Sequence, residues 1–200
     1  LIILTYLNLA QGARNMLPTH DLRLMEWLAF TPIEAPTFLR GYVALNVLDL
    51  LFFWGLSWPL MVLAAGVSGE PFAHLCTGML IMLVCLACYR LLGIALLLWL
   101  ERDEFLLYII VRIVYIIIIL VSGFVVPLLN PVLAFTDASI WPHRQELPAL
   151  PGIVFQGWHI TLGSHLLLGG LFFIIALLRV RRIQHYTAAL SPGAGGNSRE

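Results

Sequence analysis

The chain has 200 residues, of which 60% are apolar and 11% are charged, and its mean hydropathy is +0.93. Soluble domains carry roughly 25% charged and 45–50% apolar residues, so this composition excludes an ordinary soluble domain. The 11 basic residues balance the 11 acidic ones and are all arginine, which gives no sign of a nucleic-acid partner and leaves no lysine for a P-loop in this chain.

The first 40 residues carry two predicted features. Residues 1–10 are apolar but too few to cross a bilayer, which takes about 20 residues, so we expect the end of a truncated N-terminal membrane helix. A cytoplasmic amphipathic helix is predicted over residues 21–30, before Pro32 stops it. Its apolar residues share one face while Arg23 and Glu26 share the other, as in a helix that lies along a membrane surface.

Four later stretches are apolar and long enough to span a bilayer, and none shows the period-two alternation of a barrel strand. They cover residues 42–66, 75–100, 105–128 and 158–178. The sequence therefore predicts an all-α, polytopic membrane protein with four complete transmembrane helices in addition to the truncated helix and the amphipathic helix. Residues 1–183 would form the membrane domain, and residues 184–200 a disordered cytoplasmic tail.

The arginines are distributed unequally between the two sides that these spans define. They gather in the segment 14–40, the turn 101–104 and the flank 179–182, whereas the opposite side carries only Arg144. Because basic residues accumulate in cytoplasmic loops, these three segments and the C-terminus are expected in the cytoplasm.

Three charged residues fall within the predicted spans: Asp49, Arg90 and Arg112. Counted from the cytoplasmic ends, all three lie roughly 10–15 Å into the same leaflet. A lone charge there is costly, so Asp49 is expected to pair with Arg90 or Arg112, which leaves the second arginine to snorkel or to face a polar cavity. Such a cluster either fixes helix packing or lies on a substrate path.

The segment 129–157 and the histidines are expected on the external side. The prolines and tryptophans of this segment allow short half-helices or a passive loop at the interface. His74, His143 and His159 fall on the same side, but no C-x-x-C-H or H-E-x-x-H spacing is present, and the three cysteines form no metal motif. We therefore expect no metal and no cofactor.

The loop sequence Met-Glu-Trp-Leu-Ala-Phe-Thr-Pro-Ile at residues 25–33, followed by Arg40-Gly41 and a helix, resembles the permease subunits of type-two ATP-binding-cassette exporters. The resemblance continues through Ser122-Gly123 and Asn130-Pro131 to a last helix that ends in arginines, and it covers roughly residues 1–183.

The resemblance implies that residues 21–30 form a coupling helix, which docks on a separate P-loop ATPase subunit. Its contacts and exit turn would come from Arg23, Glu26, Trp27, Thr31 and Pro32. An external gate would include Asn130, Pro131 and Asp137. A second permease protomer and membrane lipids would be the other partners, and the chain itself would be a non-catalytic subunit in a bacterial inner membrane.

Two alternatives remain open from the sequence. Residues 156–163 look like a short phrase of subunit three of haem–copper oxidases, which implies an accessory subunit of a respiratory or photosynthetic complex. The second alternative is a structural relative of the permeases that has no transport activity.

Overall fold

The structure is a computed structural model that describes residues 2–13, 33–100, 104–121, 130, 144–146 and 154–190. Its helices are α1 (Ile2–Gly12), α3 (Ala35–Ser68), α4 (Phe72–Leu100), α5 (Glu104–Ile116), the π-helical turn η1 (Ile117–Val121) and α8 (Gly157–Leu190). Two short strands, β1 (Arg144–Glu146) and β2 (Val154–Gln156), pair antiparallel. The predicted helical class is confirmed at this level.

Three helices in the described part of the chain are long and apolar enough to cross a membrane: Pro36–Ser68, Phe72–Leu100 and Trp158–Arg182. The predicted third span, residues 105–128, is described as a shorter apolar helix over Phe105–Leu120, and residues 122–129 lie outside the described residues. These lengths and compositions indicate a helical membrane protein with three candidate spanning helices in the described part of the chain.

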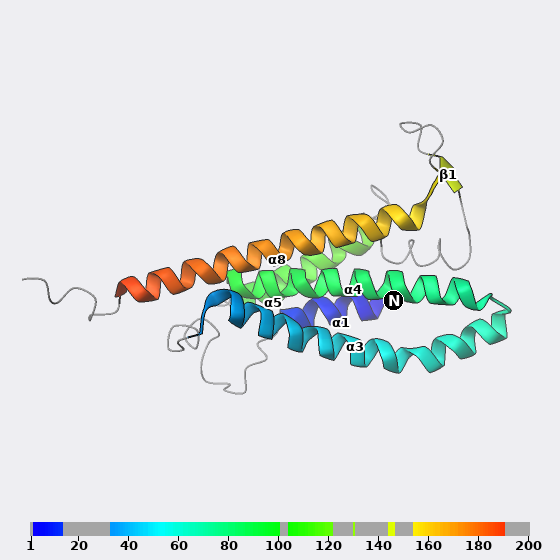
Figure 1. Ribbon diagram of the computed structural model, residues 1–200, viewed down its shortest axis with the longest axis horizontal. Helices are drawn as coiled ribbons and strands as arrows, with labels where there is room; N and C mark the ends of the chain where they lie inside the picture. The colour runs from blue at the N-terminus through cyan, green and yellow to red at the C-terminus, as the bar shows by residue number, and fades with distance from the viewer. Residues whose placement is uncertain are drawn as a thin grey trace, which may run out of the picture.

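Helix α4 forms the centre of the bundle, with α8 along one side and α3 along the other (Figure 1). Helices α1 and α5 also pack against α4. The spanning window of α4 is 61% buried, whereas that of α3 is 6% buried. In water such an exposed apolar helix would be unstable, but lipid tails satisfy its surface in a bilayer.

The helix ends lie in two groups at opposite ends of the bundle. Helices α1, α4 and α8 end, and α3 and α5 begin, at the same end of the bundle, on the left in Figure 1. The turn from α3 to α4 and the start of α8 lie at the opposite end. The three arginine-rich segments therefore adjoin one end of the bundle.

Proline and glycine residues explain where helix α3 begins and ends. Pro36 occupies its first turn, where a proline loses no helical hydrogen bond. Pro59 lies inside the helix, which a membrane helix tolerates more readily than a soluble one. The helix ends at Gly69, whose φ of 73° places it in the left-handed region that closes a helix, and its N–H bonds the Ala65 carbonyl. The chain then turns into α4.

One expectation from the sequence needs correction. Helix α8 continues to Leu190, beyond the expected start of a disordered tail at residue 184, because no glycine or proline occurs between Gly170 and Pro192. Most of the segment 129–157, where half-helices or a passive loop were expected, lies outside the described residues; within it, residues 144–146 and 154–156 form the strands β1 and β2. The segment between them contains Pro148 and Pro151, and proline cannot donate to a strand ladder.

Helices α1 and α4 cross at a pair of glycines. A Cβ on Gly12 would clash with the main-chain carbonyl of Arg90, and a Cβ on Gly93 would clash with that of Leu9. The backbones therefore approach more closely than any side chain allows, as small residues permit between membrane helices. This crossing lies one turn from Arg90.

Substitution of Gly93 by alanine is expected to force α1 away from α4 and to lower the free energy of unfolding by about 1–3 kcal/mol, the usual cost of overpacking. Gly55→Ala on α3 is the matched control, because a Cβ there meets no atom within 4 Å. Unfolding of both variants in detergent micelles measures the difference. Equal stability of the two variants would contradict the close crossing.

Candidate functional site: a buried polar centre and a lateral groove

The most unusual feature of the apolar bundle is a buried polar centre formed by Asn8 and Gln11 of α1, Asp49 of α3 and Arg90 of α4. Arg90 is 2% exposed. Its Nη2 atom forms an ion pair with Asp49 and donates to Gln11 Oε1 over 2.8 Å, and its Nη1 atom donates to Asn8 Oδ1 over 3.4 Å. One guanidinium group thus connects three helices.

The ion pair confirms one of the two pairings that the sequence allows for Asp49. The two partners differ in exposure, because the Asp49 side chain is 33% exposed whereas that of Arg90 is 2% exposed. An isolated cation in hydrocarbon is expensive, so the charge of Asp49 and the side-chain oxygens of α1 supply the compensation that Arg90 requires. The buried Arg90 therefore depends on these contacts more than the partly exposed Asp49 does.

Two buried polar atoms near this centre have no partner among the described residues: Nε of Arg90 and Oδ1 of Asn46. The amide nitrogen of Asn46 donates to the Tyr42 carbonyl over 2.9 Å, so only its oxygen is unused. One atom is a donor and the other an acceptor. The polar centre therefore retains hydrogen-bonding capacity beyond its ion pair.

Arg112, the second arginine predicted within the spans, lies apart from this centre. It is exposed on α5, and its guanidinium carbon lies 4.0 Å from the centroid of the Tyr108 ring. Tyr108 is one helical turn closer to the start of α5, so the Arg112 side chain points toward the start of the helix. This direction agrees with snorkelling, one of the two roles expected for the unpaired arginine.

A second polar contact joins α4 to α8. The Tyr89 hydroxyl lies 2.9 Å from Nε2 of His165, and Nδ1 of His165 lies 2.8 Å from the Thr161 carbonyl. Since a carbonyl only accepts, Nδ1 carries the proton of the neutral ring, and Tyr89 donates to Nε2. Both histidine nitrogens are therefore engaged within the protein, and both rings are buried.

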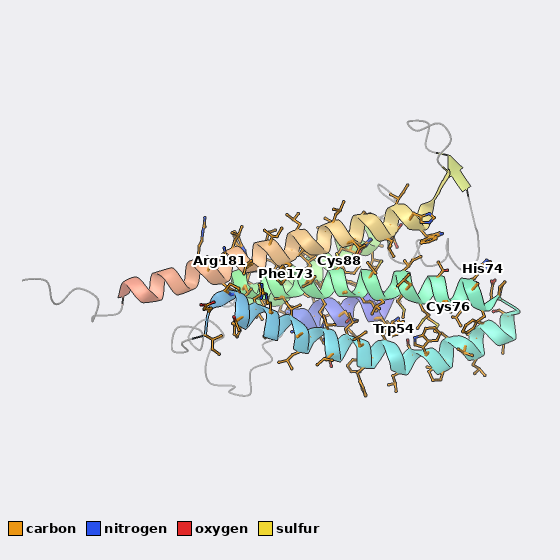
Figure 2. All side chains as sticks on the ribbon, viewed as in Figure 1. Trp54, His74, Cys76, Cys88, Phe173 and Arg181 are labelled. Carbon is orange, nitrogen blue, oxygen red and sulfur yellow. The ribbon has the colours of Figure 1, made fainter. Side chains whose placement is uncertain are left out.

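A lateral groove of about 460 Å³ lies beside this contact, between α3, α4 and α8. Its walls are apolar and include Leu50 of α3, Cys88 of α4 and Phe173 of α8; the last two are labelled in Figure 2. His165 is the polar side chain in its lining, and Gly169 and Gly170 leave space on α8. The groove is thus shaped for an apolar or amphipathic group rather than for a charged one.

Most of the residues that the resemblance singles out lie outside the described residues. They are Arg23, Glu26, Trp27, Thr31, Pro32, Pro131 and Asp137. Asn130 is described, and it is 4% exposed. Its amide donates to the Ile119 carbonyl in η1 over 2.9 Å, so this expected gate residue contacts the end of the helix before it.

Several members of these contacts were not predicted from the sequence. The signal for Asn8 and Gln11 was present, since they are amides in an otherwise apolar segment, three residues apart and thus on one helical face. The pairing of Tyr89 with His165 had no comparable signal, because the residues are 76 positions apart and the rotation of each helix decides whether they meet.

Comparisons with protein families, with curated proteins and with solved structures find no match to this chain. Among the described residues, no group of three or more histidine, cysteine, aspartate or glutamate side chains is placed to hold a metal ion. Function is therefore inferred from three features of the structure: the polar centre, the Tyr89–His165 contact and the lateral groove.

Asp49→Asn is expected to lower the free energy of unfolding by about 3 kcal/mol, because it leaves the guanidinium of Arg90 buried without a counter-charge. The double variant Asp49→Asn with Arg90→Met removes both charges and should be more stable than Asp49→Asn alone. Unfolding in mixed micelles of mild detergent and sodium dodecyl sulfate measures both. A double variant that is less stable than the single one would show that the charges are not coupled.

Tyr89→Phe is expected to cost about 1–2 kcal/mol of stability, because it leaves the buried Nε2 of His165 without its donor. Tyr108→Phe serves as the matched control, since Tyr108 is half-exposed on α5 and keeps the ring on which Arg112 lies. The same unfolding assay separates them. If both variants unfold alike, the hydroxyl of Tyr89 does not hold α8 to α4.

Proposed function

We propose that this chain is the transmembrane subunit of an ATP-driven exporter, which forms the substrate path with a second protomer and docks a separate P-loop ATPase through a coupling helix at residues 21–30. The support comes from the order of motifs along residues 25–41 and 122–131 and from the spanning helices. In this proposal the partner hydrolyses ATP, and the chain itself forms and breaks no covalent bonds.

The observation that carries the proposal is the way in which the polar centre joins the helices on either side of the loop. Helix α1 ends at Gly12 and α3 begins at Ala35, so both run directly into the loop that contains residues 21–30. Gln11 of α1 and Asp49 of α3 both bind the guanidinium of Arg90 on α4. A displacement of the loop would therefore move α1, α3 and α4 together.

Such joint movement is what a coupling element requires. If the helices on either side of the loop were independent, an ATPase that displaced the loop would bend each helix separately. The displacement would then not reach the rest of the bundle. Helices tied to one buried charge move as a rigid body, which is the usual form of a domain-scale transition. The polar centre thus gives the loop a mechanical connection to the middle of the bundle.

The lateral groove is the natural candidate for a part of the substrate path. It is bounded by α3 and α4, which the polar centre links, and by α8, which the Tyr89–His165 contact holds to α4. Its apolar walls favour a lipid-like or amphipathic cargo. Movement of α3 and α4 relative to α8 would open or close it.

The proposed location is a bacterial inner membrane, with the loop between α1 and α3 and the C-terminus in the cytoplasm. All three arginine-rich segments adjoin the bundle end at which α3 begins, and positive residues are retained on the cytoplasmic side. An ATPase docked on the loop would then have access to cytoplasmic ATP.

Glu26→Arg is expected to reduce the ATP hydrolysis that co-purifies with the tagged chain by about tenfold, because charge reversal in a docked interface costs at least one factor of ten in affinity. Glu70→Arg is the control, since Glu70 lies at the opposite end of the bundle, beside the turn after α3. The assay uses full-length protein solubilised from its own membrane in mild detergent.

Two results would contradict the proposal. If no ATP hydrolysis co-purified with the wild-type protein, no ATPase subunit would be bound to it, and an accessory or structural role would be favoured. If equal ATP hydrolysis co-purified with wild type and with Glu26→Arg, the coupling helix at residues 21–30 would not form the docking surface.

A further inference from the structure

The face shared by α1 and α5 carries a cation that the exporter proposal does not use. Arg112 is exposed in the apolar helix α5 and, among the described residues, forms no ion pair. The described acid that lies within a span, Asp49, is already paired with Arg90. An anion from outside the described bundle would pair with this guanidinium, whose neighbours in the crevice are mostly apolar.

The guanidinium of Arg112 reaches toward the bundle end at which α5 begins. It covers the ring of Tyr108, which is four residues from the start of α5 at Glu104 and therefore about 6 Å along the helix axis. The same end of the bundle carries Trp99, which is 60% exposed and has the Arg179 guanidinium 5.6 Å from its ring. Tryptophan and arginine of this kind mark a membrane–water interface.

Arg112 also belongs to the wall of a crevice of about 390 Å³ between the two helices. Helix α1 contributes Ile3 and Tyr6, and α5 contributes Arg112, Tyr115 and Ile116. The rings of Tyr6 and Tyr115 meet edge to face, with centroids 5.1 Å apart. The crevice thus combines one positive charge with aromatic and aliphatic surface.

We propose that this crevice binds an anionic phospholipid, with the phosphate on Arg112 and the first acyl carbons against Ile3 and Ile116. Charge complementarity selects the anion, and the depth of the guanidinium selects a headgroup phosphate over a soluble ion. The Tyr108 ring holds the guanidinium in place through a cation–π contact. Basic pockets between membrane helices bind anionic headgroups in this way. The site does not depend on the exporter proposal.

Native mass spectrometry of the full chain, released from neutral detergent, tests the site with two probes: dioleoyl-phosphatidylglycerol and dioleoyl-phosphatidylcholine. Wild-type protein is expected to retain the anionic lipid about fivefold more strongly than the neutral one, the gain from one arginine near the surface. Arg112→Gln should abolish this preference. Arg181→Gln, which removes an exposed arginine near the same bundle end, should keep it.

Several outcomes would overturn the proposal. The preference could persist in Arg112→Gln, or it could fall equally in Arg181→Gln, which would indicate general surface charge. Inorganic phosphate at the same concentration could displace the anionic lipid, which would indicate a soluble anion. Arg112→Gln could dissociate an oligomer with the lipid preference unchanged, which would indicate a protein carboxylate as the partner.

A second variant keeps the test decisive if Arg112→Gln fails to fold. Tyr108→Leu removes the ring that positions the guanidinium but leaves the charge, so the preference for the anionic lipid should weaken without disappearing. An unchanged preference in Tyr108→Leu would also count against the proposed geometry.

Discussion

The burial of the Arg90 guanidinium is the constraint around which this bundle is organised. Hydrocarbon cannot solvate the charge, so α1 and α3 must present Gln11, Asn8 and Asp49 to the same face of α4. The glycine crossing of Gly12 with Gly93 lies one turn away and allows α1 to come close enough. Replacement of a buried ion pair by apolar residues is often nearly neutral in energy. We therefore infer that the charges specify which helices meet rather than add net stability.

The two faces of α4 at residues 89 and 90 explain why this helix is central. Adjacent residues on a helix point about 100° apart, so Tyr89 contacts α8 while Arg90 contacts α1 and α3. An ion pair and hydrogen bonds join α4 to α3 and α1, whereas a neutral hydrogen bond joins α4 to α8. The lateral groove lies between these two attachments, where a relative movement of α8 would alter its width.

The sequence predicted the helical class and an ion pair between Asp49 and an arginine within the spans, because hydropathy and the cost of an isolated charge are local properties. The predicted third span is described only over the apolar helix Phe105–Leu120, and the end of α8 was placed too early. The contact between Tyr89 and His165 and the groove were not predictable, since both depend on how each helix is rotated about its axis. Hydropathy that is nearly uniform around α4 carries no information about that rotation.

The most direct test of the account is a measurement of the ion pair itself in a lipid bilayer. Solid-state nuclear magnetic resonance on protein with ¹⁵N-arginine and ¹³C-aspartate can detect dipolar coupling between the Nη atoms of Arg90 and the carboxyl carbon of Asp49. The account predicts a coupling typical of direct contact, which disappears in Arg90→Met. Absence of that coupling in the wild-type protein would show that α1, α3 and α4 are not held by a shared charge.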